Sequence, residues 1–217
     1  MMKLENIWFS YESKHYVLKN INLEISRKIT LVKGPNGSGK TTLLKIASLL
    51  LRPEKGRVIV DGISYWEANR KTREFLRKKI VYVHERPYLF KGTVFENLTY
   101  PLKIRGKSVK HVYEVAKKFR ILDILETDVS KLSAGMKQLT ALARAFVFKP
   151  KYVLLDEPLA NLDDKNRGEV IKLIEEYAKE GISIIIAVHG NVSFSKDAVA
   201  KIVYLNDGVI TKIVQYS

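Results

Sequence analysis

Gly34-Pro35-Asn36-Gly37-Ser38-Gly39-Lys40-Thr41 is the stretch that decides the fold. It follows the apolar run Ile29–Val32 and opens the helical candidate Thr41–Leu51. The pattern G-x-x-x-x-G-K-[ST] between a strand and a helix is typical of a loop that cradles phosphate groups. Its glycines let the backbone curl so that successive N–H groups point at phosphate oxygens, and the N-terminus of the helix adds a partial positive charge. The sequence therefore predicts a strand, a phosphate loop and a helix as one unit.

Two side chains of this loop add chemistry to its backbone. We expect the Lys40 ammonium to lie beside the β- and γ-phosphates of a nucleotide, and the Thr41 hydroxyl is a suitable oxygen ligand for Mg²⁺. The candidate nucleotide-binding residues here are Gly34, Pro35, Asn36, Gly37, Ser38, Gly39, Lys40, Thr41 and Thr42.

The rest of the chain alternates short apolar runs with helical stretches, which predicts an α/β fold with a parallel sheet covered by helices. The expected buried strands are Ile29–Val32, Ile80–Val83, Tyr152–Leu155, Ile184–Val188 and Ile202–Leu205. The expected helices are Thr41–Leu51, Val109–Leu125 and Arg167–Lys179. Antiparallel strands are expected over Leu4–Phe9, Val17–Ile25 and Arg57–Val60, and a hairpin turn is expected at Asn206-Asp207-Gly208.

Two carboxylates follow one of these strands. Asp156 and Glu157 come directly after Tyr152–Leu155, so Asp156 lies at the C-terminal end of a parallel strand, where open α/β sheets bind ligands. Asp156 is a candidate Mg²⁺ ligand, and Glu157 is a candidate general base for a water molecule near the γ-phosphate. An acidic strand end alone is weak evidence. Combined with the phosphate loop about 115 residues upstream, it predicts nucleotide hydrolysis.

The composition limits the classes of protein that remain. The chain has 217 residues and no cysteine, which fits one domain and excludes disulfide scaffolds, thiolate metal sites and cysteine nucleophiles. No apolar run approaches the ~18 residues of a membrane-spanning helix, and the N-terminus does not resemble a secretory signal. We therefore expect a cytoplasmic protein that serves a membrane only through a partner.

The formal net charge of +15 suggests anionic partners, and this charge is unevenly distributed. Residues 70–79 contain six basic side chains against Glu74, and residues 100–120 contain seven against Glu114. The two segments therefore carry +5 and +6 of the total. Two interpretations stay open for them: solvated helix faces, or a functional basic surface.

With these motifs in place, the sequence resembles the nucleotide-binding subunits of ABC (ATP-binding cassette) transporters from end to end. Leu132-Ser133-Ala134-Gly135-Met136-Lys137-Gln138 is similar to the family's signature, usually Leu-Ser-Gly-Gly-Gln. Leu159-Ala160-Asn161-Leu162-Asp163 is similar to the family's D-loop. The resemblance implies a phosphate-loop (RecA-like) core with a parallel sheet, an N-terminal antiparallel β subdomain and a helical signature subdomain. It divides the single domain, residues 1–217, into a core of residues 1–87 and 150–217 and a helical subdomain of residues 88–149.

The resemblance also implies roles for individual residues. Tyr11 matches the aromatic residue that stacks on adenine, and His189 matches the switch histidine that joins Lys40 and Glu157 in catalysis. Ser133 and Gly135 match the groups that bind the γ-phosphate held by a second subunit, which implies a dimer that opens and closes with ATP and Mg²⁺.

Two departures from the family pattern concern the site. Glu85 stands where the Q-loop of the family usually has Gln, so it would be a charged rather than a neutral Mg²⁺ ligand. If the alignment is shifted by one residue, His84 takes this position instead. In the signature, Ala134 still allows a close backbone approach, but Met136 cannot reproduce the hydrogen bonds of the usual Gln.

The partner implied by the resemblance is a membrane permease, which would hold the protein at the inner face of the cell membrane. Its coupling helix would enter a groove near Arg86–Leu98, where the apolar side chains form either a contact surface or subdomain core. Those side chains are Tyr88, Leu89, Phe90 and Phe95. Two alternatives remain: a soluble ABC ATPase that acts on nucleic acid or another macromolecule, and a scaffold that binds ATP but barely hydrolyses it. Nucleic acid is not the expected partner, because the long insertions or second cassettes of such relatives do not fit in this length.

Overall fold

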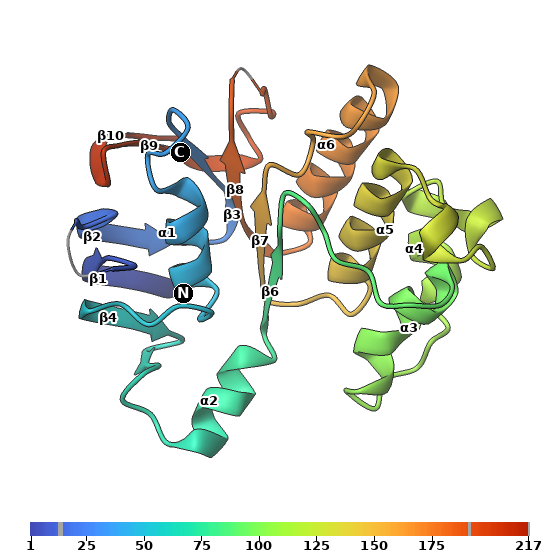
Figure 1. The fold of residues 1–217 in the computed structure, drawn as a ribbon, viewed down its shortest axis with the longest axis horizontal. Coiled ribbons are helices and arrows are strands. Elements are labelled where there is room, and N and C mark those ends of the chain that lie inside the picture. The colour runs from blue at the N-terminus through green and yellow to red at the C-terminus, as the bar shows by residue number, and fades with distance from the viewer. Residues whose placement is uncertain (13–14, 191, 217) are drawn as a thin grey trace.

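The computed structural model describes residues 1–12, 15–190 and 192–216 and contains two sheets, with most helices beside the larger one (Figure 1). The smaller sheet is antiparallel, in the order β2-β1-β4-β5. Its strands are β1 Met2–Phe9, β2 Leu18–Ile25, β4 Lys55–Val60 and β5 Ile63–Ser64. The larger sheet has the order β10-β9-β3-β8-β7-β6. Its strands are β3 Lys28–Lys33, β6 Ile80–Val83, β7 Tyr152–Asp156, β8 Ser183–Val188, β9 Val199–Asn206 and β10 Val209–Gln215.

The helices and short 3₁₀ turns complete the chain. They are α1 Lys40–Ala47, α2 Arg70–Arg77, α3 Val94–Lys103, α4 Val112–Lys118, η1 Leu122–Ile124, η2 Val129–Lys131, α5 Ala134–Phe146 and α6 Asp164–Lys179. Helices α3, α4 and α5 gather on one side of the larger sheet, whereas α1 lies between the two sheets (Figure 1). The predicted fold class is confirmed. No helix within the described residues is long and apolar enough to cross a bilayer.

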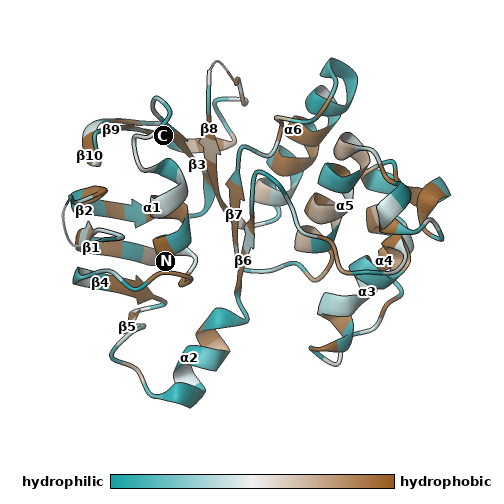
Figure 2. Cartoon of the chain, in the orientation of Figure 1, coloured by the Kyte–Doolittle hydropathy of each residue, from teal (hydrophilic) through white to brown (hydrophobic). Residues whose placement is uncertain are grey.

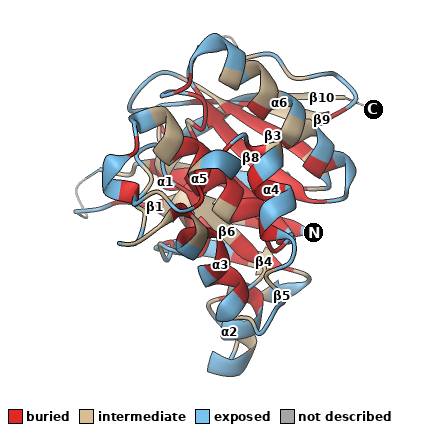
Figure 3. Cartoon of the chain, turned by 90° about the vertical axis from the view of Figure 1, so that its right-hand side faces the viewer, coloured by how far each residue is buried: buried red, intermediate tan, exposed pale blue. Residues whose placement is uncertain are grey.

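The larger sheet separates two hydrophobic cores, which explains the uninterrupted apolar run of β8. Ile184 and Ile186 face the core formed with α3, α4, α5 and α6. Ile185 and Ala187, on the opposite face of the same strand, belong to the core formed with α1 and the smaller sheet. A strand with both faces covered needs apolar residues at every position. The colouring by hydropathy and by burial shows these apolar, buried strands in the middle of the molecule (Figures 2 and 3).

Parallel pairing aligns the carboxyl ends of three strands that are far apart in the sequence. Lys33 of β3 pairs with Val188 of β8, and Asp156 of β7 pairs with Ala187 of β8. The phosphate loop that follows β3, the acidic end of β7 and the residue that follows β8 therefore meet at one edge of the sheet. This register positions the candidate site.

Two expected helices are shorter than the sequence pattern indicated. The helix expected over 41–51 ends at Ala47, because Leu49 adopts a left-handed backbone with φ of 64°. The helix expected over 109–125 is two pieces, α4 and η1, because Arg120 adopts φ of 56° between them. A left-handed residue ends an α-helix whatever the apolar pattern on either side. In both places the segments pack against buried neighbours, so burial outweighs the helical preference.

The hairpin at the end of the chain has the two-residue turn that its sequence predicted. Asn206 pairs with Val209, and Asp207 and Gly208 between them have φ of 45° and 76°. Positive φ at both central residues is the turn geometry that suits the twist of a hairpin. A Cβ atom at Gly208 would lie 2.3 Å from the Val17 carbonyl oxygen, so this position also needs glycine for close packing on the start of β2.

Asp61 joins the smaller sheet to the larger one. It accepts hydrogen bonds from Lys79 Nζ at 2.7 Å, Lys151 Nζ at 2.6 Å and Tyr152 Oη at 2.9 Å. Burial acts to raise the pKa of Asp61, but the hydrogen bonds from Lys151, Lys79 and Tyr152 outweigh it and hold the pKa well below its usual range. The ionised carboxylate therefore stabilises the folded state.

We expect Asp61→Asn to lower the free energy of unfolding by roughly 1–3 kcal/mol at neutral pH, because Tyr152, Lys79 and Lys151 lose a charged acceptor. The depressed pKa sets the pH dependence. The stabilisation is fully present above the unfolded pKa of about 3.9 and is lost as the pH falls through the folded value. Urea unfolding at neutral and acid pH measures the difference, with Asp123→Asn on exposed η1 as the control. An equal difference at both pH values would contradict this role.

Candidate nucleotide-binding site

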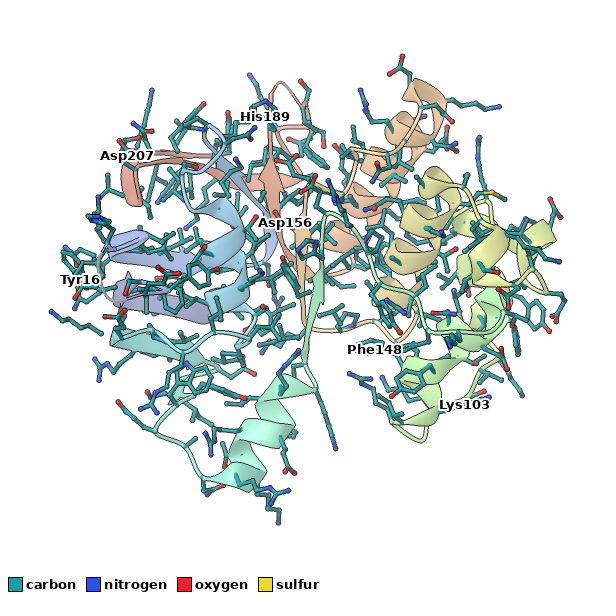
Figure 4. All side chains as sticks on the ribbon, viewed as in Figure 1. Tyr16, Lys103, Phe148, Asp156, His189 and Asp207 are labelled. Carbon is teal, nitrogen blue, oxygen red and sulfur yellow. The ribbon has the colours of Figure 1, made fainter. Side chains whose placement is uncertain are left out.

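A pocket of about 690 Å³ lies at the carboxyl edge of the larger sheet. Its lining comes from the phosphate loop, the start of α1, the segment after β6, the end of β7 and the residue after β8. It brings together ten of the residues singled out in the sequence, namely Asn36, Gly37, Gly39, Lys40, Thr41, Thr42, Glu85, Asp156, Glu157 and His189. Val17 and Ala160 also line it, and neither was expected. Figure 4 labels Asp156 at the end of β7 and His189 directly after β8.

The phosphate loop has the backbone that its glycines predicted. Gly37 and Gly39 have φ of 78° and 101°, and Gly39 is the residue that caps the N-terminus of α1. Gly34 is required for a different reason, because a Cβ atom there would lie 2.1 Å from the Leu205 carbonyl oxygen of β9. The Ser38 hydroxyl is buried and has no hydrogen-bond partner among the described residues. The first turn of α1 holds no acidic residue, so its N-terminal dipole faces the pocket uncompensated.

Lys40 lies within the loop that it is expected to serve. Its Nζ donates to the carbonyl oxygens of Gly34 at 2.8 Å and Pro35 at 3.0 Å, and no carboxylate in the described part of the chain pairs with it. Only 7% of Lys40 is exposed. A cation held by two neutral carbonyls in a pocket remains available to an anionic ligand. Gly34, Pro35 and Ser38 were also expected to bind the nucleotide, but they do not line the pocket. Gly34 and Pro35 instead hold Lys40 through their carbonyl oxygens.

Asp156 is held by Tyr82, a residue that the sequence analysis missed. The Tyr82 hydroxyl donates to Asp156 Oδ2 at 2.9 Å, and Asp156 is 2% exposed. Burial raises the pKa of Tyr82, and the charge of Asp156 and the hydrogen bond to it add to the increase. A tyrosine in the otherwise aliphatic run of β6 was the only available signal. Since a strand pattern does not say which neighbour a hydroxyl meets, the sequence could not assign this contact.

Glu157 has an unusual backbone and a constrained carboxylate. Its φ is 46°, its N–H donates to the Ala187 carbonyl oxygen at 3.0 Å, and its Oε2 accepts from the His189 backbone N–H at 3.0 Å. Burial raises the pKa of Glu157 and the nearby Asp156 charge adds to this, whereas the His189 hydrogen bond and Lys40 oppose it. The exposed His189 therefore contributes its backbone to holding Glu157.

Glu85 and His84 point to different places. Glu85 lines the nucleotide pocket, whereas His84 lines a separate groove, and its Nδ1 accepts from the Arg86 N–H at 3.0 Å. The geometry thus favours the register that puts Glu85, not His84, beside the nucleotide. Tyr11 lies at the margin of the site, with its hydroxyl 3.2 Å from Thr42 Oγ1. It is 57% exposed, so more than half of its surface is accessible to a ligand.

Ser133 and Gly135 do not line the pocket of their own chain. Ser133 caps α5, and its hydroxyl accepts from the Met136 N–H at 3.2 Å. A Cβ atom at Gly135 would lie 3.0 Å from the Asn161 carbonyl oxygen, so the signature packs against the D-loop. The start of α5 is thus exposed at Ser133 and Ala134 and is separate from the phosphate loop.

A second cavity, which we call the groove, lies between the larger sheet and the helices and has a volume of about 360 Å³. Tyr88, Phe90 and Tyr100 line it, and Tyr88 is 72% exposed. Leu89 and Phe95 pack instead against the core. The expected apolar cluster is therefore divided between a contact surface and the interior.

Asn97 and Arg144 support the aromatic wall of the groove. The buried Asn97 side chain accepts from the Phe90 N–H at 2.9 Å and donates to the Phe90 carbonyl oxygen at 2.9 Å. Arg144 donates to Asn97 Oδ1 at 3.0 Å and to the Tyr88 carbonyl oxygen. These two polar residues were not identified from the sequence. They hold the segment that follows Glu85 in place.

Known protein families and solved structures with similar sequences or folds agree with this geometry. The family model described as ABC transporter matches residues 18–160. A putative ABC transporter ATP-binding protein of Pyrococcus furiosus is 36% identical over 97% of this chain and 82% of its own length. An ATP-binding cassette solved as a dimer in a post-hydrolysis state with ADP and Pi has a TM-score of 0.88 at 27% identity, covering 99% of this chain and 98% of that one. CbiO1 of Clostridium perfringens, part of the CbiONQ transporter complex, has a TM-score of 0.83 at 29% identity, covering 99% and 88%.

The fold and the pocket define a phosphate-loop ATPase with a signature segment exposed beside its D-loop. The chain belongs to the ABC transporter family, as an ATP-binding subunit that hydrolyses ATP to drive transport. Cassettes of this family form dimers and assemble with membrane components.

Proposed function

We propose that this chain hydrolyses ATP with Lys40, Glu157 and His189, at a site completed by Ser133 and Gly135 of a second subunit. One observation carries the proposal: Lys40, Glu157 and His189, which come from separate segments of the chain, line a single pocket at the carboxyl edge of the parallel sheet. ATP would place its phosphates over the loop 34–41 and its adenine against Tyr11. The exposed position of Ser133 supports its action across a subunit interface.

Glu157 is the proposed general base. Its carboxylate would accept a proton from the water molecule whose oxygen attacks the γ-phosphorus, and ADP would leave with the bridging oxygen. The His189 N–H fixes the carboxylate orientation, and burial raises the pKa of Glu157, which improves its ability to accept a proton. Lys40 would stabilise the negative charge that develops on the phosphate oxygens.

The pocket also fits Mg²⁺ as a cofactor. Asp156, Glu85 and the Thr41 hydroxyl present only oxygen donors there. The described residues contain no cluster of three or more His, Cys, Asp or Glu side chains that could hold a metal ion alone. This matches the preference of Mg²⁺ for one or two carboxylates together with the phosphates of a nucleotide. When bound, the ion would neutralise part of the charge on those phosphates.

We expect Tyr82→Phe to lower the apparent Mg²⁺ affinity of the ATP-bound protein about 10-fold, because Asp156 loses the hydrogen bond that orients it. ATP binding in the presence of a chelator should not change. Titration of Mn²⁺, followed by its paramagnetic signal, measures metal binding apart from turnover. Tyr204→Phe on β9 is the matched control. An unchanged Mn²⁺ affinity would show that the Tyr82 hydroxyl has no role in orienting Asp156.

We expect Glu85→Gln to alter the Mg²⁺ concentration that gives half-maximal hydrolysis, because a neutral carbonyl replaces a charged ligand. The carboxylate attracts the cation more strongly, so the required concentration should rise several-fold in the variant. His84→Gln, at the neighbouring position in the groove, is the control. If only the His84 variant changes this concentration, the assignment of Glu85 to the metal site is wrong.

The groove is the proposed docking site for a membrane permease, which would hold the protein at the inner face of the cell membrane. Its open aromatic wall supports this, since Tyr88 and Tyr100 are exposed although they line a concavity. A short helix presenting apolar side chains would cover them.

Co-purification from membranes tests the docking proposal. We expect the tagged chain to retain a membrane-spanning partner, identified by mass spectrometry, and the double variant Tyr88→Asp with Tyr100→Asp to lose it. Tyr113→Asp on α4 is the control, because the exposure of Tyr113 lies between those of Tyr88 and Tyr100 and it does not line the groove. Recovery of the same partner with the double variant would overturn this docking site.

A further inference from the structure

The structure separates the two basic segments of the sequence into charges that are neutralised within the chain and charges that are not. In the second segment, Lys118 lies 2.6 Å from Glu176, and Arg120 lies 3.6 Å from Glu169, both on α6. These cations are therefore compensated by the acidic face of α6. In the first segment, Arg70 pairs with Glu74.

Lys79 of the first segment also pairs with Asp61. Seven of the other cations lie on α2 and at the end of α3, and we call the surface that they form the basic face. It consists of Lys71, Arg73 and Arg77 along α2, Lys78 directly after α2, and Lys103, Arg105 and Lys107 at and after the end of α3. None of the seven has a carboxylate within ion-pair distance in the described part of the chain. Arg77, Arg105 and Lys107 donate only to backbone carbonyl oxygens, which are those of Ile80 for Arg77, Pro101 and Lys78 for Arg105, and Phe148 for Lys107.

The two halves of the basic face lie on the same side of the molecule. Arg105 Nη2 donates to the Lys78 carbonyl oxygen at 3.4 Å, which joins the end of α3 to the end of α2. Both helices extend beyond the lower end of the larger sheet (Figure 1), and α2 forms an exposed projection there (Figure 3). Burial and the neighbouring charge of Arg77 lower the pKa of Arg105. Like charges gathered without counter-ions cost free energy, so this arrangement favours an external anionic partner.

Exposed apolar side chains lie among these charges. Phe75 is 59% exposed on α2, and Ile104 is 58% exposed beside Arg105. The groove opens between the two halves, since Arg77 and Arg105 both line it. Cations mixed with exposed aromatic and aliphatic groups suit the boundary of a bilayer, where headgroups are anionic and the acyl region begins a few ångströms below.

We infer that the basic face binds the surface of an anionic phospholipid bilayer beside the groove. The inference rests on the proposed function for its orientation, because a groove that receives a permease helix must face the membrane. Lipid contact then adds a second attachment to the one made through the permease. It also gives a role to the seven cations of the basic face, which ATP hydrolysis itself does not require.

Vesicle sedimentation of the full chain tests this inference without a permease. The probes are vesicles of phosphatidylglycerol and phosphatidylcholine in equal parts, and vesicles of phosphatidylcholine alone. We expect binding to the anionic vesicles only, and its loss at ~0.5 M salt, where surface charges are screened. Absence of binding to the anionic vesicles at low salt would overturn the inference.

The triple variant Lys71→Gln, Arg73→Gln, Lys103→Gln should reduce partitioning onto anionic vesicles about 100-fold. These three residues do not line the groove or the nucleotide pocket, so basal ATP hydrolysis should be unchanged. The matched control removes three positive charges elsewhere, from α6, the segment after β8 and β10, as Lys172→Gln, Lys196→Gln, Lys212→Gln. An equal loss in the control would show a general charge effect and overturn the inference.

Duplex RNA provides the remaining comparison. If RNA displaces the chain from the vesicles and the triple variant also loses RNA binding, the basic face is a nucleic-acid surface and the lipid inference is wrong. Failure of permease co-purification with vesicle binding intact would instead count against the docking site alone.

Discussion

Replacing Glu157 by Gln is expected to reduce the turnover number by about 100- to 10,000-fold while ATP binding persists, because Gln keeps the shape of the side chain but cannot accept a proton. Oε2 of Glu157 accepts the His189 N–H, and the Gln carbonyl oxygen can accept the same bond. The structure of the pocket should therefore be preserved. Phosphate release measured at saturating ATP gives the turnover number.

The same variant should accumulate as an ATP-bound dimer. In the proposed shared site, ATP would bridge two subunits through several charge-assisted hydrogen bonds, and this bridge would persist while the γ-phosphate is not removed. Size-exclusion chromatography with light scattering would show a dimer with ATP and a monomer with ADP. Glu126→Gln, at an exposed position, is the control. Hydrolysis by Glu157→Gln at the wild-type rate would rule out this general base, and a variant that stays monomeric with ATP would contradict the shared site.

Replacing Lys40 by Ala is expected to weaken ATP binding about 100-fold or more. The Lys40 ammonium lies within the phosphate loop and has no carboxylate partner among the described residues. When a triphosphate binds, the ammonium would donate to charged phosphate oxygens in place of the two neutral carbonyl oxygens. Charge-assisted hydrogen bonds contribute roughly 1.5–3 kcal/mol each. Isothermal titration calorimetry with ATP, and with AMP as the comparison, measures the loss. AMP lacks the β- and γ-phosphates, so its affinity should change little.

Lys45→Ala is the matched control for Lys40→Ala, because it removes the same charge from the last turn of the same helix. Thermal unfolding of both variants shows whether the loop itself is disturbed by loss of the bonds to Gly34 and Pro35. Equal ATP affinity in Lys40→Ala and the wild type would contradict the phosphate loop as the nucleotide site.

The sequence predicted the parts of the site that depend on local backbone chemistry. The phosphate loop needs glycine at Gly37 and Gly39, where φ is positive, and that requirement is visible in the residues themselves. The expected strands agree with β3, β6, β7, β8 and β9 to within three residues at each end, because strands buried on both faces are continuously apolar. The two-residue hairpin turn is likewise a local property of Asp207 and Gly208.

Other features depended on partners that are distant in the sequence. The helix boundaries near Leu49 and Arg120 were misjudged because the preference of a segment for helix does not reveal left-handed residues imposed by packing. The Tyr82 hydrogen bond to Asp156 joins residues that are 74 positions apart. The Arg144 contact with Asn97 spans 47 positions. Such contacts follow from strand order and helix packing, which no local pattern encodes.

The charged residues also separate what the local sequence predicts from what distant contacts decide. The sequence alone determined that two segments are basic, and it predicted that a nucleotide binds to the loop 34–41. Only the tertiary structure decided that α6 neutralises Lys118 and Arg120, whereas the cations along α2 and at the end of α3 have no carboxylate partner among the described residues. The physical reason is range: backbone conformation responds to the residue itself and its neighbours, whereas the energy of a charge or a hydroxyl depends on whichever groups the fold places within a few ångströms of it.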